Sequence, residues 1–158
     1  ALSESRQGFP PLPGAATEVQ QISTEVPARV LLNQQFTLPN LQQLIRAAPY
    51  PVLHLATHGQ FSSNAEDTFI LSWDNRINVK QLDGLLRDRE LGQRPIELFV
   101  LSACETAAGD NRAALGLAGI AIRSGARSTL ATLWQVNDES TAIFMVEFYK
   151  ELAKKGVT

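Results

Sequence analysis

Apolar and polar positions follow two different periods along this chain, and the periods predict its helices and strands. Helical spacing covers residues 15–26 as far as Pro27, residues 37–48 from a cap at Thr37 or Asn40, residues 79–86 from a cap at Asn78, and residues 138–155. Short apolar or β-branched runs predict strands at residues 29–33, 52–57, 69–73, 96–103 and 127–134. Residues 113–122 are apolar on every side, which indicates a buried helix that ends at Gly125.

The order of these elements predicts the fold class. Strands that alternate with helices form β-α-β units, so we expect an α/β fold with a mostly parallel sheet and helices on both faces. The 158 residues fit a single domain over residues 1–158, in which the Pro- and Gly-rich residues 1–14 form an extended lead-in that does not pack. In such sheets, functional sites lie beyond the carboxyl ends of the strands.

Composition and charge exclude several classes of protein. With 44% hydrophobic and 19% charged residues, the chain is too apolar to be disordered. Its net charge is −2, and it has no cluster of Lys and Arg, so we expect neither nucleic acid nor a membrane as partner. The longest apolar run, about ten residues, is too short to cross a bilayer. The absence of a signal sequence and the single cysteine predict a cytoplasmic location.

Two predicted strands end in residues that can carry chemistry. His58 and Gly59 follow one of them, and Cys104, the single cysteine, follows another. If these strands are neighbours, an imidazole lies beside a thiol, and it can take the thiol proton during nucleophilic attack. The glycine after the histidine leaves a backbone N–H open to a developing oxyanion.

The residues alone leave other interpretations open. A lone cysteine is commonly a small buried hydrophobic residue. Its place at the end of a strand favours a catalytic role, so the residues alone support a structural and a catalytic Cys104 about equally. His54 and His58 have the HxxxH spacing of metal ligands, but on a strand this interval spans roughly 13 Å, too far for one ion. We therefore expect no metal and no cofactor, and we interpret His54 as an interior histidine. The chain has neither a GxSxG motif nor a phosphate-binding loop.

Four segments, in order, resemble a known family. These are HLATHGQF (residues 54–61), LSACETA (101–107), SGAR (124–127) and LWQVNDEST (133–141). They are similar to the CHAT domain, a caspase-like module often attached to tetratricopeptide repeats in bacteria and distantly related to separase. The resemblance implies a three-layer α/β/α sandwich. Family members carry a strand before the lead-in and further elements after the last helix, so it also implies that this chain is truncated at both ends.

The same resemblance implies a cysteine endopeptidase that hydrolyses peptide bonds with a Cys–His dyad. His58 would be the base, Cys104 the nucleophile, and the backbone N–H groups of Gly59 and Cys104 the oxyanion hole. A peptide or protein would be the substrate, and tetratricopeptide repeats of the parent chain would be partners. Residues 111–114 depart from the family's Gly-rich loop. The alternatives are a non-catalytic binding or regulatory module of a larger repeat-containing protein, and a Cys–His acyl transferase.

Asp138 follows the last predicted strand, so it emerges at the same edge of the sheet. In separase-like relatives an acidic residue of the matching segment lines the pocket for the residue before the scissile bond, the P1 residue. Asp138 in that place implies a preference for Arg, which pairs with a carboxylate bidentately. The alternative is that Asp138 is the N-cap of the final helix.

Overall fold

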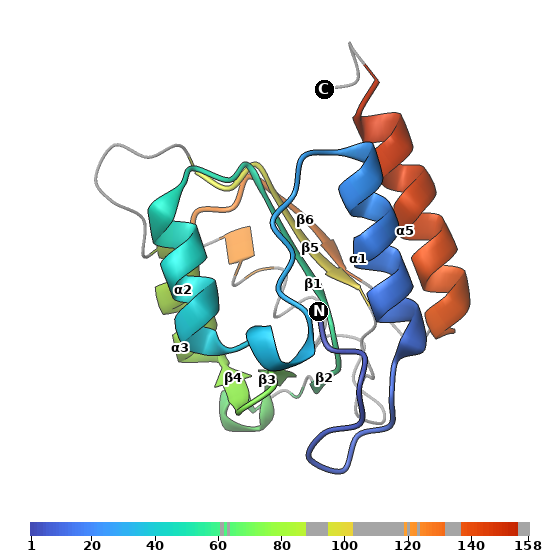
Figure 1. The fold of residues 1–158 in the computed structure, drawn as a ribbon. Helices are drawn as coiled ribbons and strands as arrows, with labels where there is room; N and C mark the ends of the chain where they lie inside the picture. The colour runs from blue at the N-terminus through green and yellow to red at the C-terminus, as the bar shows by residue number, and fades with distance from the viewer. Residues whose placement is uncertain are drawn as a thin grey trace.

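A parallel sheet runs through the middle of the molecule, between two layers of helices (Figure 1). The computed structural model describes residues 1–60, 62, 64–87, 95–102, 119, 121, 122, 124–131 and 137–154. Among these, the sheet contains β1 (Val52–Ala56), β5 (Leu98–Ser102) and β6 (Ser128–Ala131), in the order β1-β5-β6. The prediction of a parallel sheet with helices on both faces is confirmed.

The register of the central strands places the two candidate strand ends together. β1 and β5 are parallel neighbours, with Val52 opposite Leu98 at one end and Ala56 opposite Ser102 at the other. β6 pairs with the other edge of β5. The strands that lead to His58 and Cys104 are therefore neighbours, which is the condition that the sequence analysis set for a thiol beside an imidazole.

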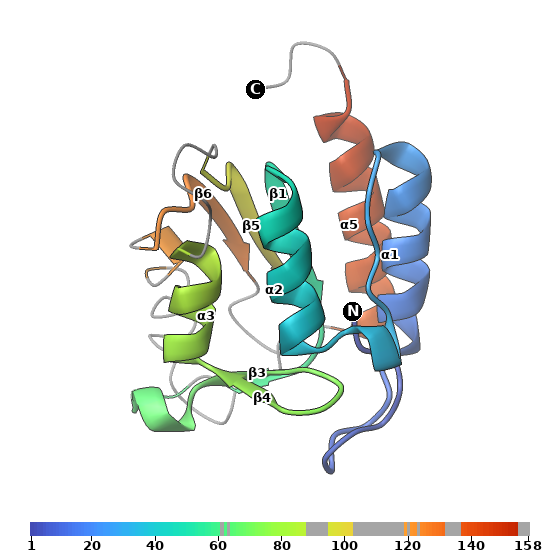
Figure 2. The ribbon, with the colours of Figure 1, turned by 60° about the vertical axis from the view of Figure 1, so that its left-hand side comes forward.

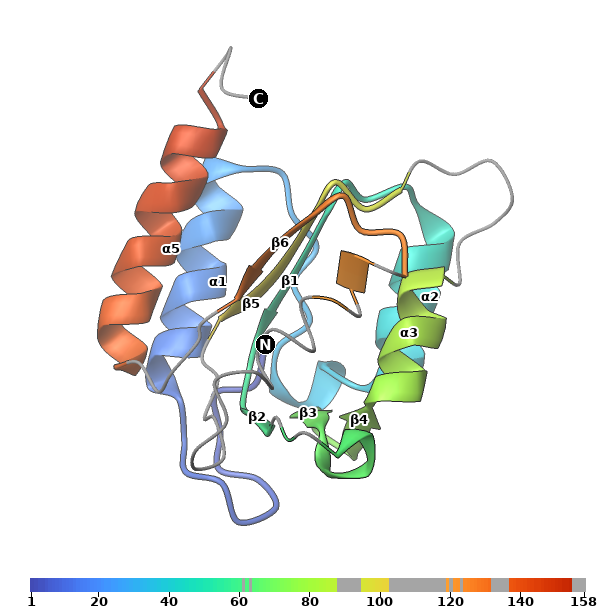
Figure 3. The ribbon, with the colours of Figure 1, turned by 180° about the vertical axis from the view of Figure 1, so that it is seen from behind.

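Two pairs of helices cover the two faces. Figures 2 and 3 show α1 (Pro13–Glu25) and α5 (Asp138–Leu152) on one face, and α2 (Leu38–Ala47) and α3 (Val79–Arg87) on the other. Thr37 is the N-cap of α2, since its hydroxyl accepts the N–H of Asn40. Asn78 accepts the N–H of Gln81 at the start of α3, as the sequence predicted.

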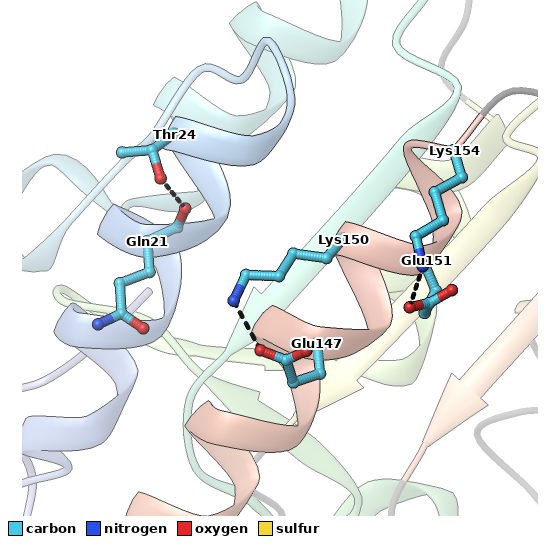
Figure 4. A network of polar contacts seen from close by, with 6 residues as sticks. All are labelled: Gln21, Thr24, Glu147, Lys150, Glu151 and Lys154. Carbon is cyan, nitrogen blue, oxygen red and sulfur yellow. Dashed lines mark hydrogen bonds and ion pairs between the residues drawn. The ribbon is translucent and has the colours of Figure 1, made fainter.

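α5 buries one face and exposes charged residues on the other. Its buried residues are Thr141, Ala142, Met145, Val146 and Tyr149. On the outer face, Lys150 pairs with Glu147 at 2.6 Å and Lys154 with Glu151 at 2.5 Å (Figure 4). The hydrogen bond and negative charge of Glu147 raise the pKa of Lys150. The sequence predicted a helix as far as residue 155, but α5 ends at Leu152, and Ala153, which follows it, is exposed.

A second, antiparallel sheet continues from the end of β1. It consists of β2 (Gly59–Gln60), β3 (Phe69–Leu71) and β4 (Arg76–Asn78), and a 3-10 turn, η2 (Ala65–Asp67), precedes β3. The sequence predicted only the strand at 69–73. The partners of β3 are too short to show a period of two residues.

Residues 29–33 do not form the predicted strand. The backbone is extended at Leu32, and the residues on either side of it bond to the first residue: the Ala1 amino group donates to Leu31 O, and Asn33 N–H donates to Ala1 O. A 3-10 turn, η1 (Asn33–Gln35), follows. The run is hydrophobic enough for a strand, but it lacks a continuous partner ladder.

The lead-in contains no helix or strand before α1 begins at Pro13, but it packs against the rest of the molecule. Leu2 is 0% exposed, and its N–H donates to the carbonyl of Ala56. The expectation that this segment does not pack was wrong. Ala1 and Leu2 are followed by six residues without an apolar side chain, so no periodicity marked Leu2.

Most of the helix predicted at residues 113–122 lies outside the described residues. Ala121 is buried, whereas Ile122 is 48% exposed, so the expectation of burial on all sides fails at Ile122. The predicted stop is confirmed: Gly125 has φ +103°, Ala126 N–H donates to Ala121 O, and Gly125 N–H donates to Ile122 O. This is a Schellman motif. None of the described helices is long and apolar enough to cross a membrane.

Candidate active site

His58 lies immediately after β1, at the junction of the two sheets. The preceding residue, Thr57, donates its hydroxyl to Leu71 O and its N–H to Ser102 O. His58 O in turn accepts the N–H of Leu71. These bonds fix the backbone on both sides of the histidine. Its side chain is 4% exposed.

A hairpin loop, residues 3–12, covers the His58 ring. Gln7 and Gly8 have φ of 49° and 86°, and Arg6 and Phe9 exchange backbone hydrogen bonds, so the tip is a two-residue turn with positive φ at both positions. The Phe9 ring lies 5.0 Å from the His58 ring, centroid to centroid. Figure 3 shows this loop, in dark blue, at the end of the sheet toward which the strand arrows point.

The loop also determines which nitrogen of His58 carries the proton. His58 Nε2 lies 2.8 Å from the carbonyl oxygen of Pro10. A carbonyl only accepts, so Nε2 must be the donor, and in the neutral ring the lone pair is then on Nδ1. Among the described residues, Nδ1 has no hydrogen-bond partner. Nδ1 is therefore the atom that can accept a proton.

Gly59 offers a backbone donor beside this ring. It lies opposite Ile70 in the β2–β3 ladder, and the hydrogen bond from Leu71 N–H to His58 O makes this a non-hydrogen-bonded pair. The Gly59 N–H therefore points away from β3. This orientation suits a donor to an external oxygen.

Cys104 lies outside the described residues. The nearest described residue before it is Ser102, the last of β5, which pairs with Ala56. His58 follows Ala56 by two positions, as Cys104 follows Ser102. Adjacent strands lie about 4.8 Å apart, so β1 and β5 end side by side at the same edge of the sheet.

Below these strand ends lies a buried polar network that the sequence did not predict. Glu18 of α1 is 1% exposed, and its Oε1 accepts from His54 Nε2 at 2.6 Å and from the Ser102 hydroxyl at 2.7 Å. His54 Nδ1 lies 3.1 Å from the Tyr149 hydroxyl. Burial, and secondarily the negative charge of Glu18, raise the pKa of Tyr149 well above its usual range. The prediction that His54 is an interior histidine is confirmed.

This network is not a Ser-His-Glu catalytic triad, although it contains the three residue types. In a triad the acid and the serine contact opposite nitrogens of the ring. Here Glu18 and Ser102 both lie next to Nε2 of His54, at 2.6 and 3.2 Å. Ser102 is also fully buried, so a substrate cannot reach it. The network therefore does not contact a substrate, and it joins elements of the fold to one another.

Two groups at the site were missed from the sequence, for different reasons. Glu18 shares the face of α1 that buries Ala15, Val19 and Ile22, so a carboxylate on an apolar helix face was a visible signal of a buried partner. The Pro10 carbonyl gave no signal, because any residue carries one and only the path of the loop brings it to His58.

Asp138 lies at the start of α5, where two helix N-termini meet. Its Oδ2 accepts the N–H of Gly14, in the first turn of α1, at 2.6 Å. The alternative that Asp138 caps α5 is wrong, because the N-cap is Asn137, which accepts the N–H of Ser140. The residues between β6 and Asn137 lie outside the description, so the expected P1 pocket stays a prediction.

A cavity of about 490 Å³ lies between α1, α2 and β1, and it is mostly apolar. His54 and Tyr149 line it, but His58 does not, so it is separate from the candidate site. Within the described part of the chain, no three His, Cys, Asp or Glu side chains gather in a way that could hold a metal ion.

No curated protein and no solved structure gives a significant match to this chain. A family model does match: that of the CHAT domain, over residues 1–158. CHAT domains are caspase-like, which relates the chain to peptidases. The match covers the whole sequence and agrees with the parallel sheet that places β1 beside β5. The chain therefore belongs to the CHAT domain family.

Proposed function

We propose that the protein is a cysteine endopeptidase with Cys104 as nucleophile and His58 as base. The observation that carries the proposal is the pairing of Ala56 with Ser102 at the ends of two parallel strands. In the sequence, His58 follows Ala56 by two positions and Cys104 follows Ser102 by two, so we expect the thiol and the imidazole at the same edge of the sheet. The Pro10 carbonyl supports the proposal, because its hydrogen bond to Nε2 leaves Nδ1 as the basic atom.

The proposed reaction has two steps. His58 Nδ1 takes the proton from the Cys104 thiol as the sulfur attacks the peptide carbonyl, and the N–H groups of Gly59 and Cys104 donate to the resulting oxyanion. The C–N bond then breaks and the leaving amine takes the proton from Nδ1. In the second step, water that gives a proton to His58 attacks the thioester, which releases the acid and regenerates the thiol. The Pro10 carbonyl accepts from Nε2 throughout.

The test uses a peptide probe with a thiol-reactive electrophile, together with a fluorogenic peptide library. The wild-type protein should cleave members of the library, and the probe should label it at one site, since Cys104 is the single cysteine. Cys104→Ala should lose both properties. His58→Ala should cleave at least about 100-fold more slowly.

Gln60→Ala serves as the control variant, since Gln60 follows the proposed oxyanion donor in β2 and has no proposed role. It should cleave like the wild type. Wild-type protein that binds peptides without cleaving them would replace the proposal with the non-catalytic binding or regulatory module. Transfer of the acyl group to added amines without hydrolysis would indicate an acyl transferase.

We also propose that the enzyme prefers Arg at P1, with the carboxylate of Asp138 in the pocket. Asp138 begins α5 and already accepts the N–H of Gly14, so a substrate guanidinium would approach a carboxylate held in place by a second helix. A fixed carboxylate favours the planar fork of Arg over the point charge of Lys.

A P1-scanning library compares Asp138→Asn with Glu139→Gln, which changes a neighbouring exposed carboxylate of the same helical turn. Asp138→Asn should lose the preference for Arg, and Glu139→Gln should keep it. A preference for Arg that survives Asp138→Asn, or a preference for acidic P1 residues, would refute the pocket. Tetratricopeptide repeats as partners, a bacterial source and a cytoplasmic location are proposals that the family resemblance and the composition carry.

A further inference from the structure

Glu18 is a carboxylate in a place where carboxylates are rarely found. It lies on the inner face of α1, 1% exposed, among residues that pack against the sheet. An ionised carboxylate in such a place is costly unless charged or hydrogen-bonding groups compensate it. An apolar side chain would give α1 the same burial without that cost. The carboxylate therefore points to a role beyond packing.

The contacts of Glu18 show what it holds. Oε1 accepts from His54 on β1 and from Ser102 on β5, so a single oxygen bonds two neighbouring strands to one helix. The Ser102 hydroxyl donates to Oε1 at 2.7 Å, and His54 Nε2 lies 2.6 Å from the same oxygen. The Tyr149 hydroxyl, which burial keeps protonated, holds the opposite side of the ring. The network fixes α1, β1, β5 and α5 relative to one another.

The place of these contacts along the strands matters for the active site. Ser102 is the last residue of β5, two positions before Cys104, and its partner Ala56 is two positions before His58. The bond from Ser102 to Glu18 is thus a side-chain bond at the point where the chain leaves the sheet toward the nucleophile. In the sequence, Cys104 follows this anchored residue by two positions.

The same helix is joined to the base. α1 begins at Pro13, three positions after Pro10, whose carbonyl bonds His58. One continuous segment, the leading loop with α1, therefore bonds His58 through the Pro10 carbonyl and β5 through Glu18. A displacement of α1 would change both halves of the dyad together.

We propose that Glu18 is a positioning residue of the dyad, acting through Ser102 to fix the end of β5 from which Cys104 follows. This rests on the proposed peptidase activity. A displacement of the reacting groups by about 1 Å can lower the reaction rate by about 100-fold. In this role, the bonds of the Glu18 carboxylate to Ser102 and His54 set the geometry at the end of β5.

Three variants test the proposal on the full chain. Glu18→Leu keeps a helix-forming side chain but removes both bonds, and Glu18→Gln keeps an acceptor oxygen. Ser102→Ala removes the bond of the Ser102 hydroxyl to Glu18 and its 3.2 Å contact with His54, and it leaves the contact between Glu18 and His54 in place. The matched control is Glu25→Leu, at an exposed glutamate of the same helix. The first measurement is kcat and KM on the fluorogenic peptide library, with kcat expressed per molecule titrated by the thiol probe.

Glu18→Leu and Ser102→Ala should each lower kcat at least about tenfold and leave KM within about threefold, since substrate contacts are intact. Glu18→Gln should recover most of kcat, and Glu25→Leu should match the wild type. A kcat within twofold of the wild type for Ser102→Ala overturns the proposal. If Glu18→Leu does not fold, the kcat of Ser102→Ala alone tests the proposal.

A second measurement tests the positioning role without relying on peptide cleavage. Iodoacetamide reports the reactivity of Cys104 without any substrate, because the chain has one cysteine. The folded wild type should react faster than the urea-unfolded protein, and Ser102→Ala should react at least about tenfold more slowly than the folded wild type. Simple destabilisation would instead expose the thiol. If the wild type cleaves no peptide, the peptidase proposal fails, and an unchanged iodoacetamide rate in Ser102→Ala overturns the positioning role as well.

Discussion

Gly14 and Gly84 are helical glycines in opposite surroundings. A Cβ at Gly14 would lie 2.7 Å from the carboxylate carbon of Asp138 and 2.8 Å from its backbone oxygen, whereas a Cβ at Gly84 would meet nothing within 4 Å. We expect Gly14→Ala to lower the free energy of unfolding by roughly 1–3 kcal/mol, because the α1–α5 contact must open. Gly84→Ala should raise it by about 0.5–1 kcal/mol, since alanine is the better helix former.

Urea denaturation of the two glycine variants measures both changes on the same two-state scale. Each substitution is Gly to Ala inside a helix, so helix propensity alone predicts the same sign for both. Opposite signs show that the close approach of Asp138 dominates at Gly14. A stabilised Gly14→Ala protein would contradict the observed contact.

The buried hydroxyl of Tyr149 should make the free energy of unfolding fall at alkaline pH. Burial, and next the charge of Glu18, raise the pKa of its hydroxyl above the ordinary value of about 10. The unfolded chain therefore ionises first, so this contribution to stability is complete below pH 10 and is lost above it, by about 1.4 kcal/mol per pH unit. Tyr149→Phe lacks the effect.

The test compares the stability of Tyr149→Phe with that of the wild type at several pH values, so the difference at pH 7 serves as the control for the difference at pH 11. At pH 7 the variant should be less stable by roughly 1–2 kcal/mol, because His54 Nδ1 loses its hydrogen bond. At pH 11 the gap should close, because only the wild type has lost the contribution of the buried phenol. Urea curves at pH 7, 9, 10 and 11 give the trend, and a constant gap would contradict the assignment.

Among the elements, α3 begins with a reciprocal cap. Asn78 Oδ1 accepts the N–H of Gln81 at 2.9 Å, and Gln81 Oε1 accepts the N–H of Asn78 at 3.0 Å. Asn78→Ala should cost about 1 kcal/mol of unfolding free energy, and the double variant with Gln81→Ala should cost less than the two single changes added. Lys80→Ala, an exposed change in the same turn, should stay within about 0.5 kcal/mol. Strict additivity would show that the two bonds form independently.

At this scale, the sequence predicted the elements whose signals are local. The apolar runs marked β1 and β5, the caps Thr37 and Asn78 marked two helix starts, and Gly125 marked a helix end. β2 and β4 were missed, because two or three residues carry no period and their pairing with β3 is set by tertiary contacts.

At the scale of the whole molecule, the hydrophobic pattern did not predict the contacts between residues that are distant in the sequence. The Pro10 carbonyl reaches His58 across a turn at residues 7 and 8, and Glu18 reaches Ser102 from a different layer. His58 and Cys104 could be named as candidates, because their residue types and strand-end positions can be seen in the sequence. The contacts of the Pro10 carbonyl and of Glu18 could not be predicted, because each depends on the packing of α1 and its leading loop against the sheet.

The same contrast between local pattern and global packing gives the last prediction. Leu2 stands in a polar, Pro-rich segment, yet it is fully buried in the core that joins α2, α3 and the two sheets. Phe144 stands in an amphipathic helix, yet it is 57% exposed. Leu2→Ala should therefore cost roughly 2–5 kcal/mol of unfolding free energy, because it leaves a cavity. Phe144→Ala should stay within about 0.5 kcal/mol, although it removes the larger side chain. Urea midpoints with unchanged m-values would measure both, and equal losses would mean that Leu2 does not belong to the core.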